Sequence, residues 1–368
     1  MQRREFLWTS VALAAGVMWP AGRAEAGFDP SPEDGWRTFD VTHRVEVLKP
    51  EGATRAWLPL PSVDEKDWIR TMGNLWQGSS GNVRLLRNRE YGAQMLYAEW
   101  APGEKPVLEV TSRVATRDRA IDLGRPGKAA PLSRAERHLN TMATQLLPTD
   151  GIVRKTALDI TRGARSDEAK ARAIYEWVVD NTFRNPKTRG CGLGDIRFML
   201  ESGDLSGKCA DLNALYVGLA RAAGLPARDV YGIRVADSRF GYKSLGKSGD
   251  ISKAQHCRAE VWLTGHGWVP VDPADVRKVV LEEPPGGLSL TDEKVTDVRK
   301  RLFGAWEMNW MAYNTAHDVA LPGSRKVTVP FLMYPQAETA AGMLDSLDST
   351  TFSYKITSKE LLMENSGT

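Results

Sequence analysis

Hydrophobic and polar residues alternate with a period of two in the first third of the chain. The alternating positions include Phe39, Val41, His43, Val45 and Val47, and residues 107–110 repeat the pattern. Alternation of this kind is typical of β-strands that bury one face. Clusters of Pro and Gly separate the strands at residues 59–61, 79–81 and 101–103. The pattern predicts a small antiparallel β-domain.

The hydrophobic pattern becomes helical from Ser166 onward. This residue is a candidate N-cap, acidic residues follow it, and apolar residues then recur on one face as far as Val178. A second helix is predicted to begin at Cys209 and to stop at Gly224, because Pro226 follows just beyond. Strands are predicted at residues 229–235, 257–263, 268–271, 327–333 and 351–356.

The first 26 residues have the features of an export signal. Residues 3–7 (RREFL) match a twin-arginine signal, and the apolar stretch at 6–19 is too short to span a membrane. Residues 24–26 (AEA) form a small-x-small cleavage site. We therefore expect the mature protein to begin near Gly27 and to work in the bacterial periplasm. No later stretch approaches the roughly 20 apolar residues of a membrane span, so we expect none in the mature protein.

These patterns divide the chain into four parts. We expect a signal peptide at residues 1–26, an N-terminal β-domain at 27–125, a core at 126–290 and a C-terminal β-containing extension at 291–368. The predicted linker lies near residues 124–130, where Pro and Gly gather.

The composition excludes several classes of partner. The 49 basic and 46 acidic residues nearly balance, and no run of Lys or Arg forms a basic patch. We therefore expect no nucleic-acid partner. The 5 histidines and 3 cysteines show no C-x-x-C or H-x-x-x-H spacing, and no glycine-rich phosphate loop is present. We accordingly expect neither a metal nor an organic cofactor.

Three residues of complementary chemistry follow one another in the predicted core. Cys209 stands in the first turn of a helix, where free N–H groups and the helix dipole lower the pKa of a thiol. His256 opens a predicted strand, and Asp272 ends the next one. A thiol nucleophile needs a base to take its proton and a third group to orient that base. The sequence thus predicts a catalytic Cys209, His256 and Asp272.

Each of these residues also has a simpler interpretation. Cys209 would otherwise be a buried structural cysteine, and His256 a core histidine with satisfied hydrogen bonds. Asp272 would otherwise cap the turn before a proline, and Asp275 competes with it for the role of orienting carboxylate. Asp211 is expected to be an acid that stabilises the helix start.

Two segments around these residues resemble the transglutaminase-like superfamily. They are CADLNALYVGLARAAGLPAR at residues 209–228 and HCRAEVWLTGHGWVPVDP at residues 256–273. The resemblance implies an α+β fold with a papain-like transglutaminase core, preceded by a small antiparallel β-domain and followed by a C-terminal β-containing extension. It also selects His256 among the histidines and favours Asp272 over Asp275. Cys257 departs from the family pattern, and strand alternation predicts that its side chain points away from the site.

The resemblance implies acyl transfer on a peptide or protein substrate. Cys209 would attack an amide carbonyl to leave a thioester, with His256 acting first as base and then as acid. Resolution of the thioester by water would make the protein a protease or amidase, which we favour. Resolution by an amine would make it a cross-linking transglutaminase. A non-catalytic envelope binding module that retained the fold is a third alternative.

Two features of the site stay open at the level of sequence. Members of the family take an oxyanion-stabilising side chain from upstream of the nucleophile, often Trp or Gln. Trp177 is the nearest upstream tryptophan, but its helical spacing favours core packing, so we assign no residue. Cys191 and Cys257 are possible disulfide partners, because a nucleophilic Cys209 must stay reduced.

Overall fold

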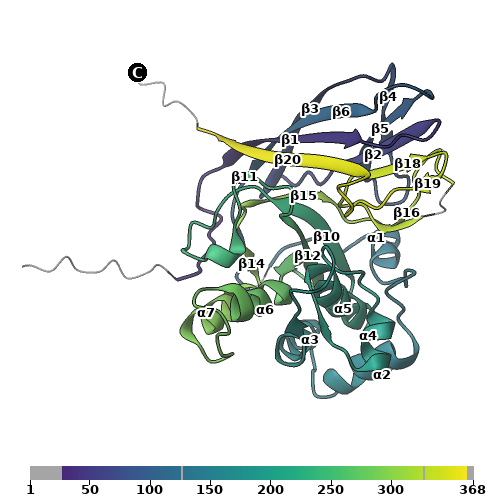
Figure 1. The fold of residues 1–368 in the computed structure, drawn as a ribbon. Helices are drawn as coiled ribbons and strands as arrows, with labels where there is room; N and C mark the ends of the chain where they lie inside the picture. Colours follow the sequence, from purple (N-terminus) through teal and green to yellow (C-terminus); the bar gives the residue numbers. More distant parts are fainter. Residues whose placement is uncertain (1–26, 126, 326–327, 363–368) are drawn as a thin grey trace, which may run out of the picture.

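The computed structural model describes residues 27–125, 127–325 and 328–362. Its elements form a mixed α+β fold in which β-sheets lie at one end and most helices at the other (Figure 1). The predicted fold class is therefore confirmed. The predicted export signal at residues 1–26 lies outside the described residues.

Two five-stranded antiparallel sheets form a β-sandwich. Their strand orders are β11-β20-β1-β6-β3 and β19-β18-β2-β5-β4. Alternate residues of both sheets, including Val45, Leu58, Leu96 and Val110, form one buried apolar cluster. The period of two in β1 and β6 thus reflects one buried face per strand. β2 and β5 bury their other face as well, through Trp57, Met95 and Tyr97. The strands are β1 (Arg37–Val47), β2 (Thr54–Leu60), β3 (Ile69–Gly78), β4 (Asn82–Arg87), β5 (Gln94–Trp100), β6 (Val107–Thr116), β11 (Gly249–Asp250), β18 (Gln336–Thr339), β19 (Gly342–Met343) and β20 (Phe352–Leu361).

The C-terminal strands belong to this sandwich. β20 pairs with β1 from Thr38 opposite Leu361 to Val47 opposite Phe352, and β18 pairs with β2. Figure 1 shows β20 and β1 side by side although they come from opposite ends of the chain. The strands β18, β19 and β20, between residues 336 and 361, therefore do not stand apart from the N-terminal strands. The exact domain boundaries stay a prediction.

The core of the fold is a four-stranded antiparallel sheet covered by helices. Its order is β13 (Gly267–Val271), β12 (Gln255–Leu263), β10 (Ala227–Arg234) and β15 (Trp310–Asn314). Every residue of α5 (Cys209–Ala222) is buried, because the helix lies between this sheet and other helices. The helix predicted from Cys209 is thus confirmed, as are the three strands that follow it.

The remaining helices and strands complete the fold. The helices are α1 (Arg134–Leu139), α2 (Gly151–Ile160), α3 (Asp167–Asn181), α4 (Ile196–Ser202), α6 (Pro273–Glu282), α7 (Glu293–Arg301) and the 3₁₀ helix η1 (Lys243–Leu245). The small strands are β7 (Arg119–Ala120), β8 (Phe183–Arg184), β9 (Ser206–Gly207), β14 (Ala305–Trp306), β16 (His317–Val319) and β17 (Val329–Phe331). The α3 helix begins after its N-cap Ser166, as predicted.

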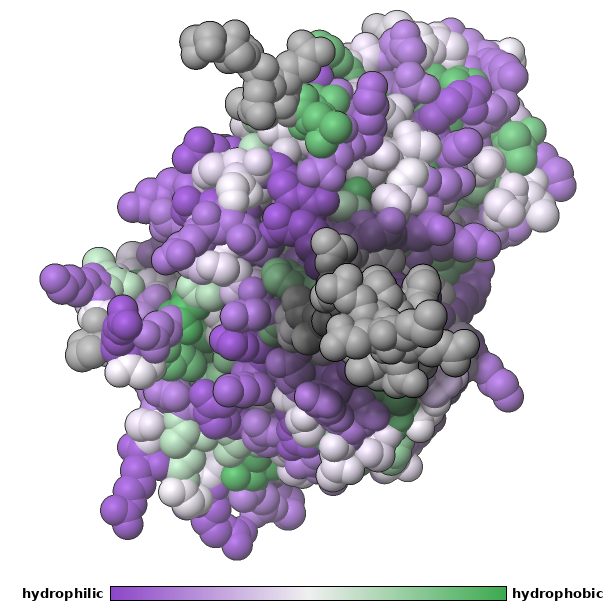
Figure 2. Space-filling model, turned by 90° about the vertical axis from the view of Figure 1, so that its left-hand side faces the viewer, coloured by the Kyte–Doolittle hydropathy of each residue, from purple (hydrophilic) through white to green (hydrophobic). Residues whose placement is uncertain are grey.

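The described residues contain no helix with both the length and the apolar character needed to cross a membrane. On the face shown in Figure 2, hydrophilic side chains predominate and apolar ones are scattered among them. This distribution agrees with apolar residues that serve mainly to fill the sandwich and the core.

Candidate active site

The predicted nucleophile Cys209 is the first residue of α5. The carboxylate of Asp211 accepts hydrogen bonds from the N–H of Lys208 and from two N–H groups of residues 193–194, each at 2.9 Å. It thereby caps the helix and holds the preceding loop against it. Gly192 permits this approach, because it has φ +94° and an added Cβ would lie 1.8 Å from the carboxylate. Asp211 is thus the helix-start acid that the sequence predicted.

The three cysteines meet at the start of α5, and all three are buried and free. No disulfide joins Cys191 to Cys257. The Cys191 carbonyl accepts a hydrogen bond from the N–H of Ala210 at 2.9 Å, which holds its side chain beside the helix. Hydrogen bonds with Cys191 and Cys257 hold the pKa of Cys209 well below its usual range, although burial acts in the opposite direction. The bond with Cys209 raises the pKa of Cys191 in turn.

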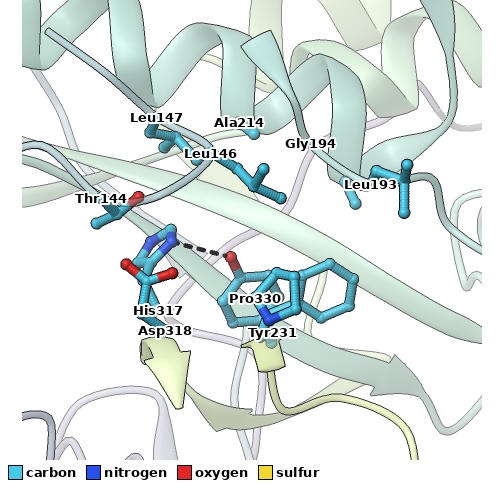
Figure 3. A pocket seen from close by; sticks show the side chains of 12 residues that line it. Thr144, Leu146, Leu147, Leu193, Gly194, Ala214, Tyr231, His317, Asp318 and Pro330 are labelled. Atoms are coloured by element: carbon cyan, nitrogen blue, oxygen red, sulfur yellow. Dashed lines mark hydrogen bonds between the residues drawn. The ribbon is translucent and has the colours of Figure 1, made fainter. Parts of the chain in front are cut away.

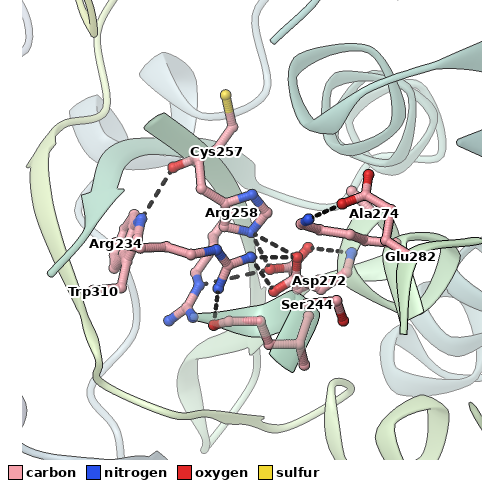
Figure 4. Close-up of polar contacts among 12 residues, drawn as sticks. Arg234, Ser244, Cys257, Arg258, Asp272, Ala274, Glu282 and Trp310 are labelled. Atoms are coloured by element: carbon pink, nitrogen blue, oxygen red, sulfur yellow. Dashed lines mark hydrogen bonds and ion pairs between the residues drawn. The ribbon is translucent and has the colours of Figure 1, made fainter. Parts of the chain in front are cut away.

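The position of Cys257 corrects one expectation from the sequence. Its sulfur lies on the side opposite the Asp272 carboxylate (Figure 4), as strand alternation predicts. It stays close to the nucleophile, however, because Cys191, Cys209 and Cys257 belong to one buried cluster.

His256 opens β12, and its ring lies between the nucleophile and two carboxylates. Its Nε2 is 2.7 Å from Oδ2 of Asp272 and 3.3 Å from Oδ1 of Asp275. After the neighbouring thiols, the ring also contributes to the lowered pKa of Cys209. Because both carboxylates contact Nε2, Nδ1 is the ring nitrogen left for the sulfur. Burial lowers the pKa of His256, but Asp275 and Asp272 prevail and raise it to about 10. A proton on this imidazole and a thiolate on Cys209 therefore stabilise each other near neutral pH.

Asp272 makes the contacts that both interpretations of the sequence require. Its Oδ2 contacts the His256 ring, while its Oδ1 accepts the N–H of Asp275 at 3.1 Å and caps α6. Asn213 donates to the same Oδ1 at 3.1 Å. The side chain is fully buried. Capping and hydrogen bonding together fix the direction in which this carboxylate meets the imidazole.

The main partner of Asp275 is an arginine and not His256. Arg234 binds both of its carboxylate oxygens, at 2.6 and 2.8 Å (Figure 4). Although burial opposes the shift, the charge of Arg234 holds the pKa of Asp275 well below its usual range. On the other side, Nε of Arg258 lies 3.6 Å from Oδ2 of Asp272. The negative charges of Asp272 and Asp275 are thus compensated by two buried guanidinium groups and the imidazole.

Sequence reasoning missed three residues of this arrangement: Asn213, Arg234 and Arg258. Two of them carried a signal. Asn213 lies four residues after Cys209 on the same face of α5, and Arg258 lies two residues after His256 on the same face of β12. Arg234 ends β10, and only the pairing of that strand with β12 shows that it faces the site.

A cleft of about 920 Å³ opens in front of Cys209 and His256. The C-terminal region supplies part of its wall through Tyr334, in the loop between β17 and β18, and through Phe352 and Tyr354 of β20. Trp177 does not line the cleft, since it packs against the main apolar core as its helical spacing predicted. Within the described residues, the backbone N–H of Cys209 has no hydrogen-bond acceptor.

His256, Asp272 and Asp275 form the one group in the described residues whose ligand atoms lie close enough together to hold a metal ion. The charges around it already balance, because Arg234 occupies both oxygens of Asp275. The contacts of these three residues are accounted for without an ion.

A second buried polar group lies on the other side of α5. Oδ2 of Asp229 is 3.4 Å from Nε2 of His317, and the Tyr231 hydroxyl is hydrogen-bonded to Nδ1 of that ring at 3.4 Å (Figure 3). Burial raises the pKa of Asp229 to about 7, although Arg221 acts against it. Burial also lowers the pKa of His317 well below its usual range. This carboxyl therefore ionises only at a cost to stability.

Replacing Asp229 with asparagine should stabilise the fold above about pH 7 and have little effect near pH 4. The folded pKa lies above the unfolded value of roughly 3.9. The stability contributed by the protonated Asp229 carboxyl is therefore complete below the unfolded pKa. It is lost as the pH rises towards the folded pKa of about 7. Thermal unfolding of the wild type and Asp229→Asn from pH 4 to 8 tests this. The exposed Asp67→Asn is the control, and a constant difference across the range would contradict the prediction.

Comparison with known proteins agrees with this fold. A family model described as the transglutaminase-like superfamily matches residues 154–273. An uncharacterized protein of Haemophilus influenzae is 36% identical over 344 residues, which cover 88% of this chain and 91% of that protein. The crystal structure of a "putative cysteine protease" from Cytophaga hutchinsonii has a TM-score of 0.57 and 13% identity, over 90% of this chain and 93% of that one.

A core sheet covered by helices, with a cysteine at the start of the central helix, defines a transglutaminase-like fold, the type found in cysteine enzymes. The chain belongs to the transglutaminase-like superfamily. The catalytic roles of Cys209, His256 and Asp272 stay a prediction.

Proposed function

We propose that the protein is an exported cysteine hydrolase, a protease or amidase, that cleaves amide bonds through Cys209, His256 and Asp272. One observation carries this proposal. A thiol of lowered pKa and an imidazole hydrogen-bonded to a buried carboxylate at 2.7 Å face a cleft of about 920 Å³. Thiols buried for structure alone have raised pKa values, as Cys257 does here.

The geometry supports a two-step reaction. The Cys209 thiolate attacks the amide carbonyl, and its free N–H stabilises the oxyanion of the tetrahedral intermediate. Protonated His256 gives its proton to the leaving amine, and a thioester remains. His256 then takes a proton from water, whose oxygen attacks the thioester and releases the acid and the thiolate. Asp272 holds the ring in place and stabilises its charged form throughout.

Alkylation of Cys209 directly tests the hypothesis that this residue is a catalytic nucleophile. Its reaction with iodoacetamide should persist well below pH 8.5, the ordinary thiol pKa, because hydrogen bonds and His256 stabilise the thiolate. His256→Ala should move the pH curve upward, since it removes the charged partner. Cys191 and Cys257 serve as internal controls, because their raised pKa values keep them protonated. If the alkylation of Cys209 followed the ordinary thiol pKa, and His256→Ala left its pH dependence unchanged, the result would favour the non-catalytic binding module.

Hydrolysis and cross-linking are separated by the fate of the thioester. Bulk water resolves it unless a site for a lysine-like amine excludes water, and the cleft has an open mouth lined by polar residues. Mass spectrometry of products formed with a glutamine peptide and excess amine donor distinguishes the two. Free acid is expected, and a predominance of the amide would favour a cross-linking transglutaminase.

We also propose that the protein is exported to the periplasm through the twin-arginine route. Support comes from Arg3 and Arg4 and from the cleavage site that ends at Ala26. Replacing both arginines with lysine should retain the precursor in the cytoplasm, because a receptor reads the pair. Cell fractionation followed by immunoblotting measures this. Normal processing of the double variant would refute the route.

A further inference from the structure

The cleft in front of Cys209 has an excess of positive charge. Seven cationic side chains and one carboxylate, that of Asp250, line it among the described residues. The cations are Arg184, Arg189, Lys208, Arg234, Lys247, Lys253 and Lys278. This ratio differs sharply from the near balance of the whole chain, with 49 basic and 46 acidic residues.

Four of these cations are already paired with carboxylates. Arg234 binds Asp275, and Arg189 binds Asp345 at 2.5 Å. Arg184 and Lys278 share Glu282. The remaining three, Lys208, Lys247 and Lys253, form no ion pair with any described residue.

The three unpaired lysines lie on both sides of the reacting groups. Lys208 directly precedes Cys209 in the chain. Lys247 and Lys253 belong to the connection between β10 and β12, which leads into His256, and both are exposed. Asp250 lies between them in the sequence, and its carboxylate accepts the N–H and hydroxyl of Ser252. The charges of Lys355 and Lys247 act on this carboxylate, but neither lysine forms an ion pair with it. Cationic side chains thus outnumber carboxylates in the cleft that contains the thiol.

We propose that the cleft selects acidic peptides, with carboxylates on the residues that flank the scissile amide. This inference rests on the proposed function and specifies its substrate class. Clefts lined by one sign of charge focus the field and raise the local concentration of oppositely charged ligands. Because the lysines are partly or fully exposed, each contact with a substrate carboxylate contributes modestly, and the effect depends on ionic strength.

Binding to the Cys209→Ala protein tests the inference without turnover. The probe is a fluorescein-labelled hexapeptide with two glutamates on each side of a central Ala-Ala pair, compared with its glutamine and lysine counterparts. Fluorescence anisotropy should show the order Glu tighter than Gln tighter than Lys. Lys247→Gln and Lys253→Gln should each weaken the glutamate peptide by about two- to fivefold and leave the glutamine peptide unchanged. Added salt should reduce the preference.

The control variant is Lys66→Gln, an exposed lysine outside the cleft, which should change nothing. The same peptides are then assayed for cleavage by the wild-type protein. Cleavage of all three peptides at equal kcat/KM, with equal binding, would overturn the acidic selectivity and leave the hydrolase proposal intact. Selective binding of the glutamate peptide without cleavage of any peptide would support the selectivity and contradict the hydrolase.

Discussion

Asp272→Asn is expected to lower turnover by about 10⁴-fold, the scale seen when an orienting carboxylate of a catalytic triad becomes an amide. In the structure, Oδ2 of Asp272 meets Nε2 of His256 at 2.7 Å. An asparagine amide would donate to that nitrogen and favour the tautomer with its proton on Nδ1. That proton would face Cys209, and the ring could no longer act as its base. Initial rates with a fluorogenic peptide measure the loss.

Asp275→Asn is the matched control for this prediction. Asp275 lies 3.3 Å from the same Nε2, but its bidentate partner is Arg234. Its loss should lower turnover by no more than about tenfold, since Asp272 still sets the tautomer. It should cost about 3–5 kcal/mol in the free energy of unfolding, because a buried guanidinium loses its partner. A greater loss of turnover in Asp275→Asn than in Asp272→Asn would mean that Asp275, and not Asp272, is the carboxylate that orients His256.

Glu260→Gln is expected to lower the free energy of unfolding at pH 7 by about 3–5 kcal/mol. Glu260 is fully buried on β12, with one oxygen bound to Arg119 and the other to Arg228 at 2.5 Å. Arg119 lies on β7 and Arg228 on β10, so this carboxylate joins the segment that leaves the sandwich to the core sheet. Its neutral replacement leaves Arg119 without a carboxylate partner and Arg228 with only the more distant Glu65, at 3.8 Å. Urea unfolding measures the effect.

The difference in the free energy of unfolding between the wild type and Glu260→Gln should change with pH in a definite direction. Burial would raise the pKa of Glu260, but Arg228 and Arg119 prevail and lower it. The stability from this group is therefore present above the unfolded pKa of roughly 4.3 and is lost as the pH falls through the folded pKa. The difference between wild type and variant should shrink on acidification. Glu99→Gln is the control, because Glu99 pairs with Arg55 at 3.0 Å near the surface and such pairs contribute at most about 1 kcal/mol.

Much of the core was predictable because its signals are local. The helix from Cys209 to Ala222 follows from apolar periodicity and the Gly-Leu-Pro stop. The hairpin of β12 and β13 brings the end of the second strand back beside the start of the first. This geometry places Asp272 near His256, and it depends only on the strand lengths and the turn.

The surroundings of the site were not predictable in the same way. Cys191 reaches Cys209 only because Asp211 and Ala210 hold its loop against α5. Arg234 reaches Asp275 through the register of β10 with β12. No spacing along the chain encodes these contacts, since they arise when separate elements pack into one core.

By itself, the sequence determined the family, the α+β class and the order in which thiol, imidazole and carboxylate enter the core. These depend on residue types and on periodicities that extend over one element at a time. Only the tertiary structure decided that β20 would pair with β1, that C-terminal residues would wall the cleft, and that three lysines would remain unpaired around Cys209. Such pairings join residues hundreds of positions apart. The free energy that selects them comes from burying both faces of the assembled sheets, which no single segment can specify.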